Sequence, residues 1–261
     1  MSAVVVVKLG GAPLGESTGL LGELAELHHR LSLVVVHGGG NRVTSWLERL
    51  GVPTRFEEGR RVTDEATLEV ATAVLRGAVN VELVAALRLA GADAVGISGV
   101  DGGLLAGRRL AGLGRVAAIA AVHRELLDTL LDAGRLPVVA PLALDEGGAI
   151  CNVNADDVAV AIARGLGAAQ LILLTDTDGV RDAAGRRLAT LEPHAVAALV
   201  ASGVIDGGMI PKVRAALDAV ADGGAGAAVI ADGSVSGAIG RALGDQGFGS
   251  RALAATRAEA R

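Results

Sequence analysis

Val4-Val5-Val6-Val7-Lys8-Leu9-Gly10-Gly11 is the stretch of sequence that decides the fold. Its β-branched residues form a continuous apolar run, which is typical of a parallel strand covered by helices on both faces. The glycines that follow end the strand, and Lys8 stands just before them. The pattern therefore predicts a buried strand that carries a lysine to one edge of a sheet.

The rest of the chain repeats this alternation of short apolar runs and longer helical patterns. Such alternation indicates βαβ units, so we expect an α/β protein: a three-layer α/β/α sandwich with a mostly parallel central sheet. The expected strands are Val4–Val7, Leu33–Val36, Ala94–Ile97, Pro137–Ala140, Leu171–Leu174 and Ala227–Ile230. The expected helices lie near 17–31, 41–50, 64–89, 123–133, 154–166, 193–202 and 211–222.

Composition limits the class of partner and the compartment. Half of the 261 residues are apolar, enough for one substantial core, while the net charge of -5 and the 1% of aromatic residues disfavour nucleic acid or a membrane surface as partner. The single cysteine, Cys151, excludes an internal disulfide and fits a reducing compartment. The run Val4–Val7 is too short for a signal peptide or a membrane span. We therefore expect a cytoplasmic protein without nucleic-acid or membrane partners.

Two glycine-rich segments end neighbouring strands of the expected sheet. In open α/β sheets, ligands bind beyond the carboxyl ends of the strands, where Lys8-Leu9-Gly10-Gly11 and His37-Gly38-Gly39-Gly40 fall. Glycine lets a phosphate approach backbone N–H groups, and the second segment also opens a helix, whose N-terminus attracts anions. Each segment alone is equally compatible with an ordinary turn. Neither matches G-x-x-x-x-G-K-[ST] or G-x-G-x-x-G, which disfavours a P-loop ATPase and a Rossmann dehydrogenase.

Further polar segments stand at the starts of other expected helices. Arg61, just before a helix capped by Thr63 or Asp64, suits bidentate binding of a carboxylate, although a surface arginine is the commoner case. Lys212 lies in the first turn of its helix, where the dipole disfavours a cation, so we expect an anion nearby. Two more segments are candidates for a binding site: Cys151-Asn152-Val153-Asn154-Ala155-Asp156-Asp157 and Thr175-Asp176-Thr177-Asp178-Gly179-Val180. The first is equally compatible with a simple helix cap, and the second with an ordinary Asp-Gly turn.

Taken in order, K-x-G-G, H-G-G-G, G-x-R-V-T-D, N-V-N-A-D, T-D-x-x-G-V and G-G-M-I-P-K resemble the amino acid kinase family. The resemblance runs from about Val4 to Asp232 and is greatest to the members that phosphorylate N-acetyl-L-glutamate. It implies ATP-dependent transfer of a phosphoryl group to the side-chain carboxylate, giving an acyl phosphate without a covalent enzyme intermediate. Such a reaction needs charge neutralisation and in-line alignment but no general base, and His37 is interpreted as structural.

The resemblance also assigns roles to individual residues. Lys8 and Lys212 would flank the transferred group, and Asp156 would orient both lysines. Backbone N–H groups of the glycine segments would hold phosphate oxygens, and four polar side chains would bind the acylated amino acid. The phosphate-binding set is Lys8, Gly10, Gly11, Gly39 and Gly40, and the acceptor-binding set is Gly39, Gly40, Arg61, Asn80, Asn152 and Asn154.

The chain is expected to form a single domain, 1–261, with two lobes. The lobe of about 1–168 would bind the acylated amino acid, and the lobe of about 169–261 would bind ATP. Mg²⁺ would be held by the nucleotide phosphates and water, so no protein residue is assigned to it. The ATP-binding set is Thr175, Asp176, Asp178, Gly179, Val180, Gly208, Met209 and Lys212.

The sequence departs from the family pattern at two places. Asn41 replaces the proline that commonly follows the three glycines, and residues 112–117 lack the aspartate and final glycine of the usual hairpin over the acceptor. The acyl group and the chain length of the acceptor therefore stay open. One alternative is a kinase of carrier-protein-linked aminoadipate or glutamate in lysine or arginine biosynthesis. Another is a catalytically silent regulator that binds nucleotide or amino acid.

The oligomeric state is also predicted from the resemblance. Family members that arginine inhibits carry an additional N-terminal helix, through which they form hexamers. Here the first strand begins at about Ala3, so we expect a homodimer that is insensitive to arginine.

Overall fold

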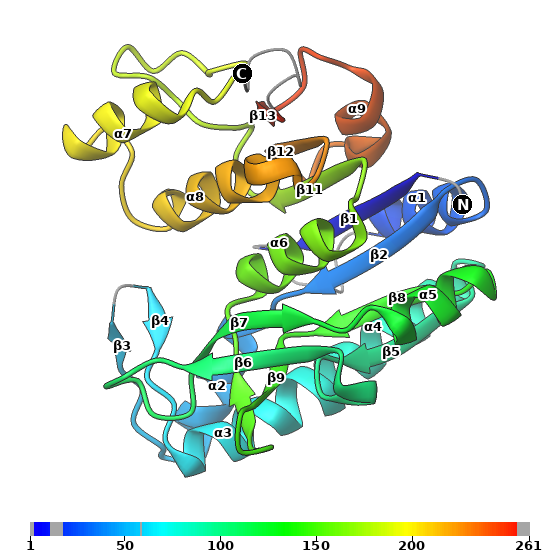
Figure 1. Ribbon diagram of the computed structural model, residues 1–261, viewed down its shortest axis with the longest axis vertical. Coiled ribbons are helices and arrows are strands. Elements are labelled where there is room, and N and C mark those ends of the chain that lie inside the picture. The colour runs from blue at the N-terminus through cyan, green and yellow to red at the C-terminus, as the bar shows by residue number, and fades with distance from the viewer. Residues whose placement is uncertain (1–2, 11–17, 58, 255–261) are drawn as a thin grey trace.

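The computed structural model describes residues 3–10, 18–57 and 59–254. Its central sheet has seven strands in the order β13-β12-β11-β1-β2-β8-β5, and all neighbours are parallel except β12 and β13. All six strands expected from the sequence are present, and the predicted α/β class with a mostly parallel sheet is confirmed (Figure 1). The strands are β1 (Val4–Leu9), β2 (Ser32–His37), β5 (Ala94–Ser98), β8 (Leu136–Ala140), β11 (Gln170–Thr175), β12 (Ala227–Asp232) and β13 (Ser250–Leu253).

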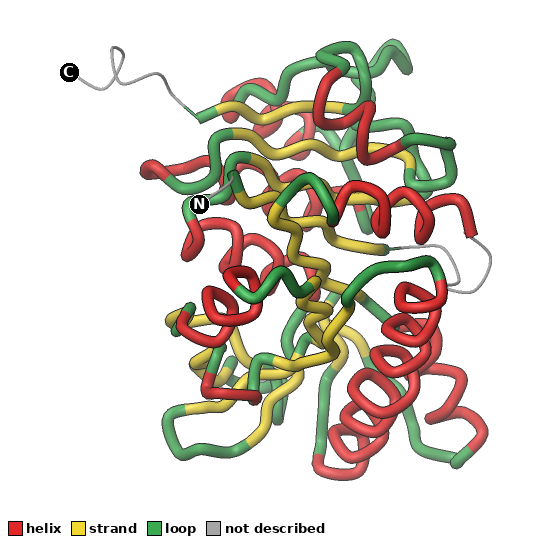
Figure 2. The backbone as a smooth tube through the Cα atoms, turned by 90° about the vertical axis from the view of Figure 1, so that its right-hand side faces the viewer, coloured by secondary structure: helices red, strands yellow, loops and turns green. Residues whose placement is uncertain are grey.

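Helices cover both faces of this sheet, as Figure 2 shows with the strands between two groups of helices. Alternate side chains of β1 divide between the two faces: Val5 and Val7 pack with α1, α4 and α9, and Val6 packs with α5, α6, α7 and α8. Burial on both faces explains why the strands read as continuous apolar runs. The bounds are α1 (Thr18–His28), α4 (Asn80–Leu89), α5 (Glu125–Asp132), α6 (Ala155–Leu166), α7 (Pro193–Ala201), α8 (Met209–Val220) and α9 (Ala238–Gly244).

A second sheet of four strands, in the order β10-β9-β6-β7, was not predicted from the sequence. Its strands are short and rich in alanine and leucine, and they lack the β-branched runs that mark the main sheet. A hairpin formed by β3 (Phe56–Glu57) and β4 (Arg60–Arg61) was also missed. The second sheet consists of β6 (Leu105–Arg109), β7 (Ala117–Val122), β9 (Leu142–Asp145) and β10 (Ile150–Asn152).

The long helix expected over 64–89 is continuous but changes its winding. It runs through α3 (Glu65–Thr72), a π-helical segment η1 (Ala73–Val79) and α4, and Asp64 caps it by accepting a hydrogen bond from the Thr67 N–H. By length and composition alone, Glu65–Leu89 would be able to cross a membrane. Its buried residues instead pack against α1, α2 and the sheet, as expected of a core helix.

The remaining helices start close to where the sequence placed them. α2 (Gly40–Arg49) begins at the last glycine of the HGGG segment. α8 begins at Met209, two residues before the expected Pro211, so the proline is the third helical residue and Lys212 still lies near the start of the helix. The carboxyl ends of β1 and β2 and the starts of α2, α6 and α8 thus meet along one edge of the sheet.

Candidate active site

Two lysines contact one carboxylate at the carboxyl edge of the sheet. Nζ of Lys8, near the end of β1, lies 2.8 Å from Oδ1 of Asp156 in the first turn of α6. Nζ of Lys212, from the start of α8, donates a hydrogen bond of 3.3 Å to Oδ2 of the same carboxylate. Within the described part of the chain, Oδ1 has no partner of hydrogen-bonding geometry, so the contact with Lys8 is an ion pair governed by charge. The three residues that the resemblance assigned to catalysis are therefore brought together.

Burial and charge compete at this cluster. Lys8 and Asp156 are each only 6% exposed. Burial lowers the pKa of Lys8 below 10.5, aided by the charge of Lys212 and opposed by that of Asp156. Burial alone would raise the pKa of Asp156, but the charges of Lys8 and Lys212 outweigh it, and the net shift is downward. Asp156 thus stays ionised, and its one negative charge faces two ammonium groups, an arrangement that favours an additional anion.

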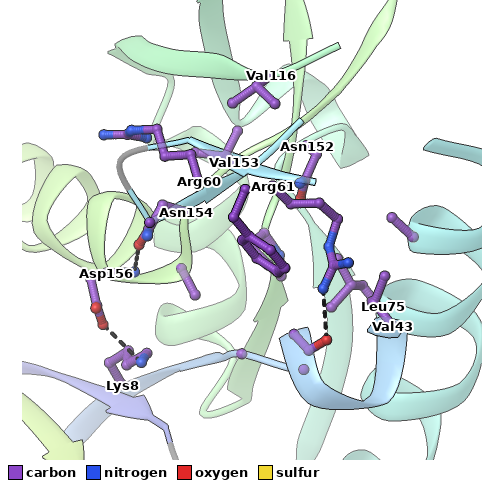
Figure 3. Close-up of a pocket in the computed structure, with 18 residues that line it drawn as sticks. Lys8, Val43, Arg60, Arg61, Leu75, Val116, Asn152, Val153, Asn154 and Asp156 are labelled. Atoms are coloured by element: carbon purple, nitrogen blue, oxygen red, sulfur yellow. Dashed lines mark hydrogen bonds and ion pairs between the residues drawn. The ribbon is translucent and has the colours of Figure 1, made fainter. Parts of the chain in front are cut away.

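A pocket of about 200 Å³ opens beside this cluster (Figure 3). It is smaller than the roughly 300–1,000 Å³ typical of sites for drug-sized ligands, which suits a small metabolite. Glycines of the HGGG segment, charged residues of the β3–β4 hairpin and the start of α6 surround it, with an apolar wall between them. The lining residues are Lys8, Gly38, Gly39, Gly40, Val43, Phe56, Gly59, Arg60, Arg61, Ala71, Leu75, Val116, Pro141, Asn152, Val153, Asn154, Ala155 and Asp156.

Arg61 brings a buried positive charge to this pocket. Its side chain comes from β4, and Nη2 donates hydrogen bonds to the carbonyl of Gly40 and to Oγ1 of Thr44. Its guanidinium lies 4.7 Å over the ring of Phe56, in cation–π geometry. Nη1 is buried and has no hydrogen-bond partner among the residues that the structure describes. A buried, unpaired donor on a guanidinium is costly, so this group is poised to bind an anion.

The two asparagines of the NVNAD segment have different contacts. Asn152, in β10, donates from Nδ2 to Oγ1 of Thr63 across 3.3 Å and lines the pocket. Asn154 is the N-cap of α6, and its Oδ1 accepts a hydrogen bond of 2.7 Å from the N–H of Asp156. The cap therefore fixes the turn that carries Asp156, and Asn154 also lines the pocket.

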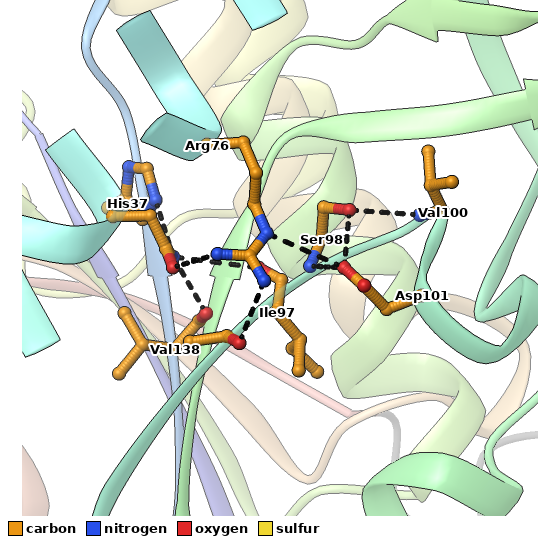
Figure 4. Close-up of polar contacts among 9 residues, drawn as sticks. His37, Arg76, Ile97, Ser98, Val100, Asp101 and Val138 are labelled. Atoms are coloured by element: carbon orange, nitrogen blue, oxygen red, sulfur yellow. Dashed lines mark hydrogen bonds and ion pairs between the residues drawn. The ribbon is translucent and has the colours of Figure 1, made fainter. Parts of the chain in front are cut away.

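Asn80 is fully buried and lies outside the pocket lining, in a polar network under the glycine segment. Figure 4 shows two members of this network, His37 and Arg76. Nδ2 of Asn80 donates to the carbonyl of Val138 and to Nε2 of His37, and its Oδ1 accepts from Arg76. Nδ1 of His37 lies 2.7 Å from the carbonyl of Gly38, so this nitrogen carries the proton. Burial lowers the pKa of His37 to about 4. Neutral His37 thus supports the HGGG segment and is unsuited to act as a base in the pocket.

The glycines allow close packing around the cluster. A Cβ on Gly10 would lie 2.4 Å from Nζ of Lys8, so this glycine leaves the space that the lysine side chain occupies. Gly39 has φ +150°, and a Cβ there would lie 2.8 Å from Leu75 of the π-helical segment. Gly40 begins α2 and faces the pocket. Gly11, also expected to bind phosphate, lies outside the described residues.

The residues expected to bind ATP lie in the part of the chain from β11 to α8. Thr175 ends β11 and is buried, and Gly208 caps α8 ahead of Met209. Gly179 and Val180 contact Ser250: the N–H of Val180 donates to its hydroxyl, which also occupies the space of a Cβ on Gly179. Asp176 is exposed, and its Oδ1 accepts a hydrogen bond of 3.0 Å from Thr175; Asp178 pairs with Arg181 at 3.0 Å.

Sequence reasoning missed several residues of this site. Arg60 forms an ion pair of 2.8 Å with Asp157, which ties the β3–β4 hairpin to α6. Phe56 has no motif that marks it, because its role arises from a contact within the folded hairpin. Thr63 stands in the G-x-R-V-T-D motif and was expected only as a possible helix cap, so its contact with Asn152 was not foreseen.

Comparison with known proteins identifies the class to which this fold and cluster belong. Residues 3–232 match the model of the amino acid kinase family, and the chain belongs to that family. It is 48% identical over 244 residues to the acetylglutamate kinase of Rubrobacter xylanophilus, covering 92% of each chain, and 44% identical over 227 residues to that of Geobacillus kaustophilus, covering 85% of this chain and 87% of that one. The crystal structure of smu.665 from Streptococcus mutans is 29% identical, with a TM-score of 0.79 over 89% of this chain and 96% of that one. The resemblance noted in the motifs is thus confirmed.

Proposed function

We propose that this protein transfers the γ-phosphoryl group of ATP to the side-chain carboxylate of N-acetyl-L-glutamate, forming an acyl phosphate in arginine biosynthesis. The observation that carries the proposal is the pair of lysines on Asp156 at the side of a small pocket lined by Arg61, whose Nη1 has no hydrogen-bond partner in residues 3–10, 18–57 and 59–254. The identity to acetylglutamate kinases over most of both chains supports the choice of acceptor.

The chemistry follows from the charges at the cluster. A carboxylate with a pKa near 4.3 is ionised at neutral pH, so its oxygen attacks the γ-phosphorus without a base. The bond from the γ-phosphorus to the bridging oxygen breaks, and ADP leaves with the electron pair. Lys8 lines the acceptor pocket and Lys212 comes from the nucleotide half, so their ammonium groups lie on either side of the migrating group and neutralise its charge. Asp156 keeps both amines in place.

The acceptor would be held by its polar groups in the pocket. Nη1 of Arg61 would donate to the α-carboxylate, and Asn152 and Asn154 would contact the acylated amide. Val43, Leu75 and Val116 form an apolar wall that fits a methyl group. The N–H groups at Gly39 and Gly40, at the start of α2, would hold oxygens of the phosphoryl group or of the carboxylate it joins.

ATP would lie against the start of α8 and the end of β11. Thr175, Asp176, Asp178, Gly179, Val180, Gly208 and Met209 would surround the nucleotide. Mg²⁺ would be held by the nucleotide phosphates and by water. The carboxylate of Asp156 is already paired with two lysines and so is not expected to bind the ion. When bound, the ion would neutralise charge on the phosphates.

A coupled assay of ADP release tests the proposal. The panel contains N-acetyl-L-glutamate, N-acetyl-L-aminoadipate, L-glutamate, L-aspartate, carbamate and UMP, each with Mg-ATP. We expect turnover with N-acetyl-L-glutamate and at least tenfold less with each of the others. Preference for N-acetyl-L-aminoadipate would favour the alternative of a kinase that acts on carrier-protein-linked aminoadipate or glutamate. No turnover with any acylated amino acid would favour the other alternative, a catalytically silent protein that binds nucleotide or amino acid.

We further propose that the protein is a cytoplasmic homodimer without sensitivity to arginine. The exposed Val81 and Leu89 of α4 are apolar surface that a second copy would cover. Sedimentation showing a monomer or a hexamer, or strong inhibition by millimolar arginine, would contradict this proposal.

A further inference from the structure

Thr63 connects the backbone of Arg61 to the side chain of Asn152, two residues proposed to bind the acceptor. It is fully buried, between Arg61 in β4 and the cap of α3. Its hydroxyl donates a hydrogen bond of 2.8 Å to the carbonyl of Arg61 and accepts one of 3.3 Å from Nδ2 of Asn152. The first bond uses the only hydroxyl proton, so the Asn152 amide must present its N–H side to Thr63 and its Oδ1 away from it.

A loop of the second sheet secures this connection from the other side. Thr63 donates its N–H to the carbonyl of Leu113 and accepts at its carbonyl from Arg115, and the carbonyl of Arg115 accepts from the N–H of Asn152. Gly114 sits between these contacts with φ +70°, and a Cβ there would lie 2.3 Å from the Thr63 carbonyl oxygen. The loop thus joins β4 to β10 through backbone hydrogen bonds. This is the segment that departs from the family pattern.

We propose that Thr63 is a positioning residue that sets the relative placement of Arg61 and Asn152 for binding of the acylated amino acid. The inference rests on the proposed function, because it concerns the pocket assigned to the acceptor. Thr63 itself does not line that pocket. Its hydroxyl acts through its two partners, which both do (Figure 3).

Removal of the Thr63 hydroxyl, with the shape of the side chain kept, tests this role. Thr63→Val keeps the branched shape and removes both hydrogen bonds, and Thr63→Ser restores the hydroxyl. We expect Thr63→Val to raise the KM for N-acetyl-L-glutamate about tenfold, the effect of one buried hydrogen bond. The KM for ATP should change less than twofold, and Thr63→Ser should recover most of the loss. An unchanged KM for the acceptor, or an equal rise for ATP, would overturn the proposal.

Thr67→Val is the matched control. Thr67 is also buried, four residues further along, and its hydroxyl contacts the capping Asp64 rather than the pocket. It should change thermal stability without changing the KM for the acceptor. If Thr67→Val raises the KM for the acceptor as much as Thr63→Val does, the effect comes from a general loss of stability, and the positioning role of Thr63 is wrong.

A pair of glycine variants tests the same role without altering Thr63. Gly112 and Gly114 both have positive φ, so alanine imposes backbone strain at either position. A Cβ on Gly112 meets nothing within 4 Å, whereas one on Gly114 would displace the Thr63 carbonyl. Gly114→Ala should therefore raise the KM for the acceptor at least fivefold more than Gly112→Ala. Equal effects would contradict the proposal even if Thr63→Val failed to fold.

Asn152→Ala separates this inference from the proposed function. If it raises the KM for the acceptor while Thr63→Val does not, the pocket assignment stands and the role of Thr63 is wrong. If neither variant nor Arg61→Ala affects that KM, the pocket assignment itself is wrong. In a double-mutant cycle, we expect Thr63→Val to have a severalfold smaller effect once Asn152 is alanine.

Discussion

Lys212 donates a hydrogen bond to Asp156 across 56 positions of sequence and between two helices that both begin at the same sheet edge. A lysine near a helix start opposes the helix dipole. Asp156 compensates for part of this cost, and Lys8 shares the same carboxylate from the neighbouring strand. The geometry therefore favours two amines facing a common anion.

Removal of either amine should abolish most of the phosphoryl transfer. Lys8→Ala and Lys212→Ala should each lower kcat roughly 100-fold or more, the size of losing one electrostatic contact to a transition state. Steady-state kinetics measure the effect, and circular dichroism checks folding. Arg214→Ala, which removes an exposed cation from the same helix α8, should retain activity. An unchanged kcat would exclude the altered lysine from the mechanism.

Arg61 should act on acceptor binding rather than on ATP. Arg61→Ala removes a charge-assisted contact, typically about 1.5–3 kcal/mol, so the KM for N-acetyl-L-glutamate should rise roughly 10- to 100-fold. Arg55→Ala, at an exposed arginine paired with Glu57, is the control. If the KM for ATP rises instead, the two lobes have been assigned in the wrong order.

Acid should weaken the fold through His37. Its pKa is near 6.5 in the unfolded chain and about 4 in the folded one, so the unfolded chain binds the proton first as the pH falls. The stability contributed by neutral His37 is complete above pH 6.5 and is lost progressively toward pH 4, by up to roughly 3 kcal/mol.

Urea unfolding of the protein and of His37→Asn measures this loss. The difference in unfolding free energy between the two should shrink as the pH falls from 6.5 to 4. A difference independent of pH would show that His37 does not titrate in this range.

The scarcity of lysine offers a chemical test. Lys8 and Lys212 are the two lysines of the sequence, so an amine-selective reagent has few targets besides the N-terminus. The side chain of Lys212 is 20% exposed and that of Lys8 7%, so Lys212 should react first, with loss of activity. Peptide mass mapping locates the adduct, and saturating Mg-ATP should prevent it. An adduct at Lys212 with full activity would contradict its proposed role.

The sequence predicted six of the seven strands of the main sheet because their signals are local; the short edge strand β13 was not predicted. Val4–Val7 and the five similar runs are buried on both faces, so every position is apolar and the strand can be recognised without its neighbours. The second sheet was missed because Leu105–Arg109 and Ala117–Val122 owe their strand conformation to pairing with each other and with β9. Their residues have weak strand preference of their own.

The residues of the candidate site also divide into those that local motifs mark and those whose position depends on tertiary contacts. Lys8, Arg61, Asn152, Asp156 and Lys212 stand in motifs or at helix starts, and the sequence alone singled them out. Asn80 was assigned to the acceptor pocket, but its buried contacts with His37 and Arg76 place it beneath the glycine segment.

The sequence by itself determined six of the seven strands of the main sheet, the helices between them, and which residues stand at the ends of those strands. Tertiary structure alone decided that Thr63 bridges Arg61 and Asn152, and it gave the geometry of the contact between both lysines and Asp156 that the resemblance implied. Apolar runs, and the glycines and prolines that end strands and begin helices, depend only on residues close together in the chain, so they can be recognised from the sequence. Contacts across 50 to 150 positions depend on how the sheets and helices pack, which no local pattern encodes.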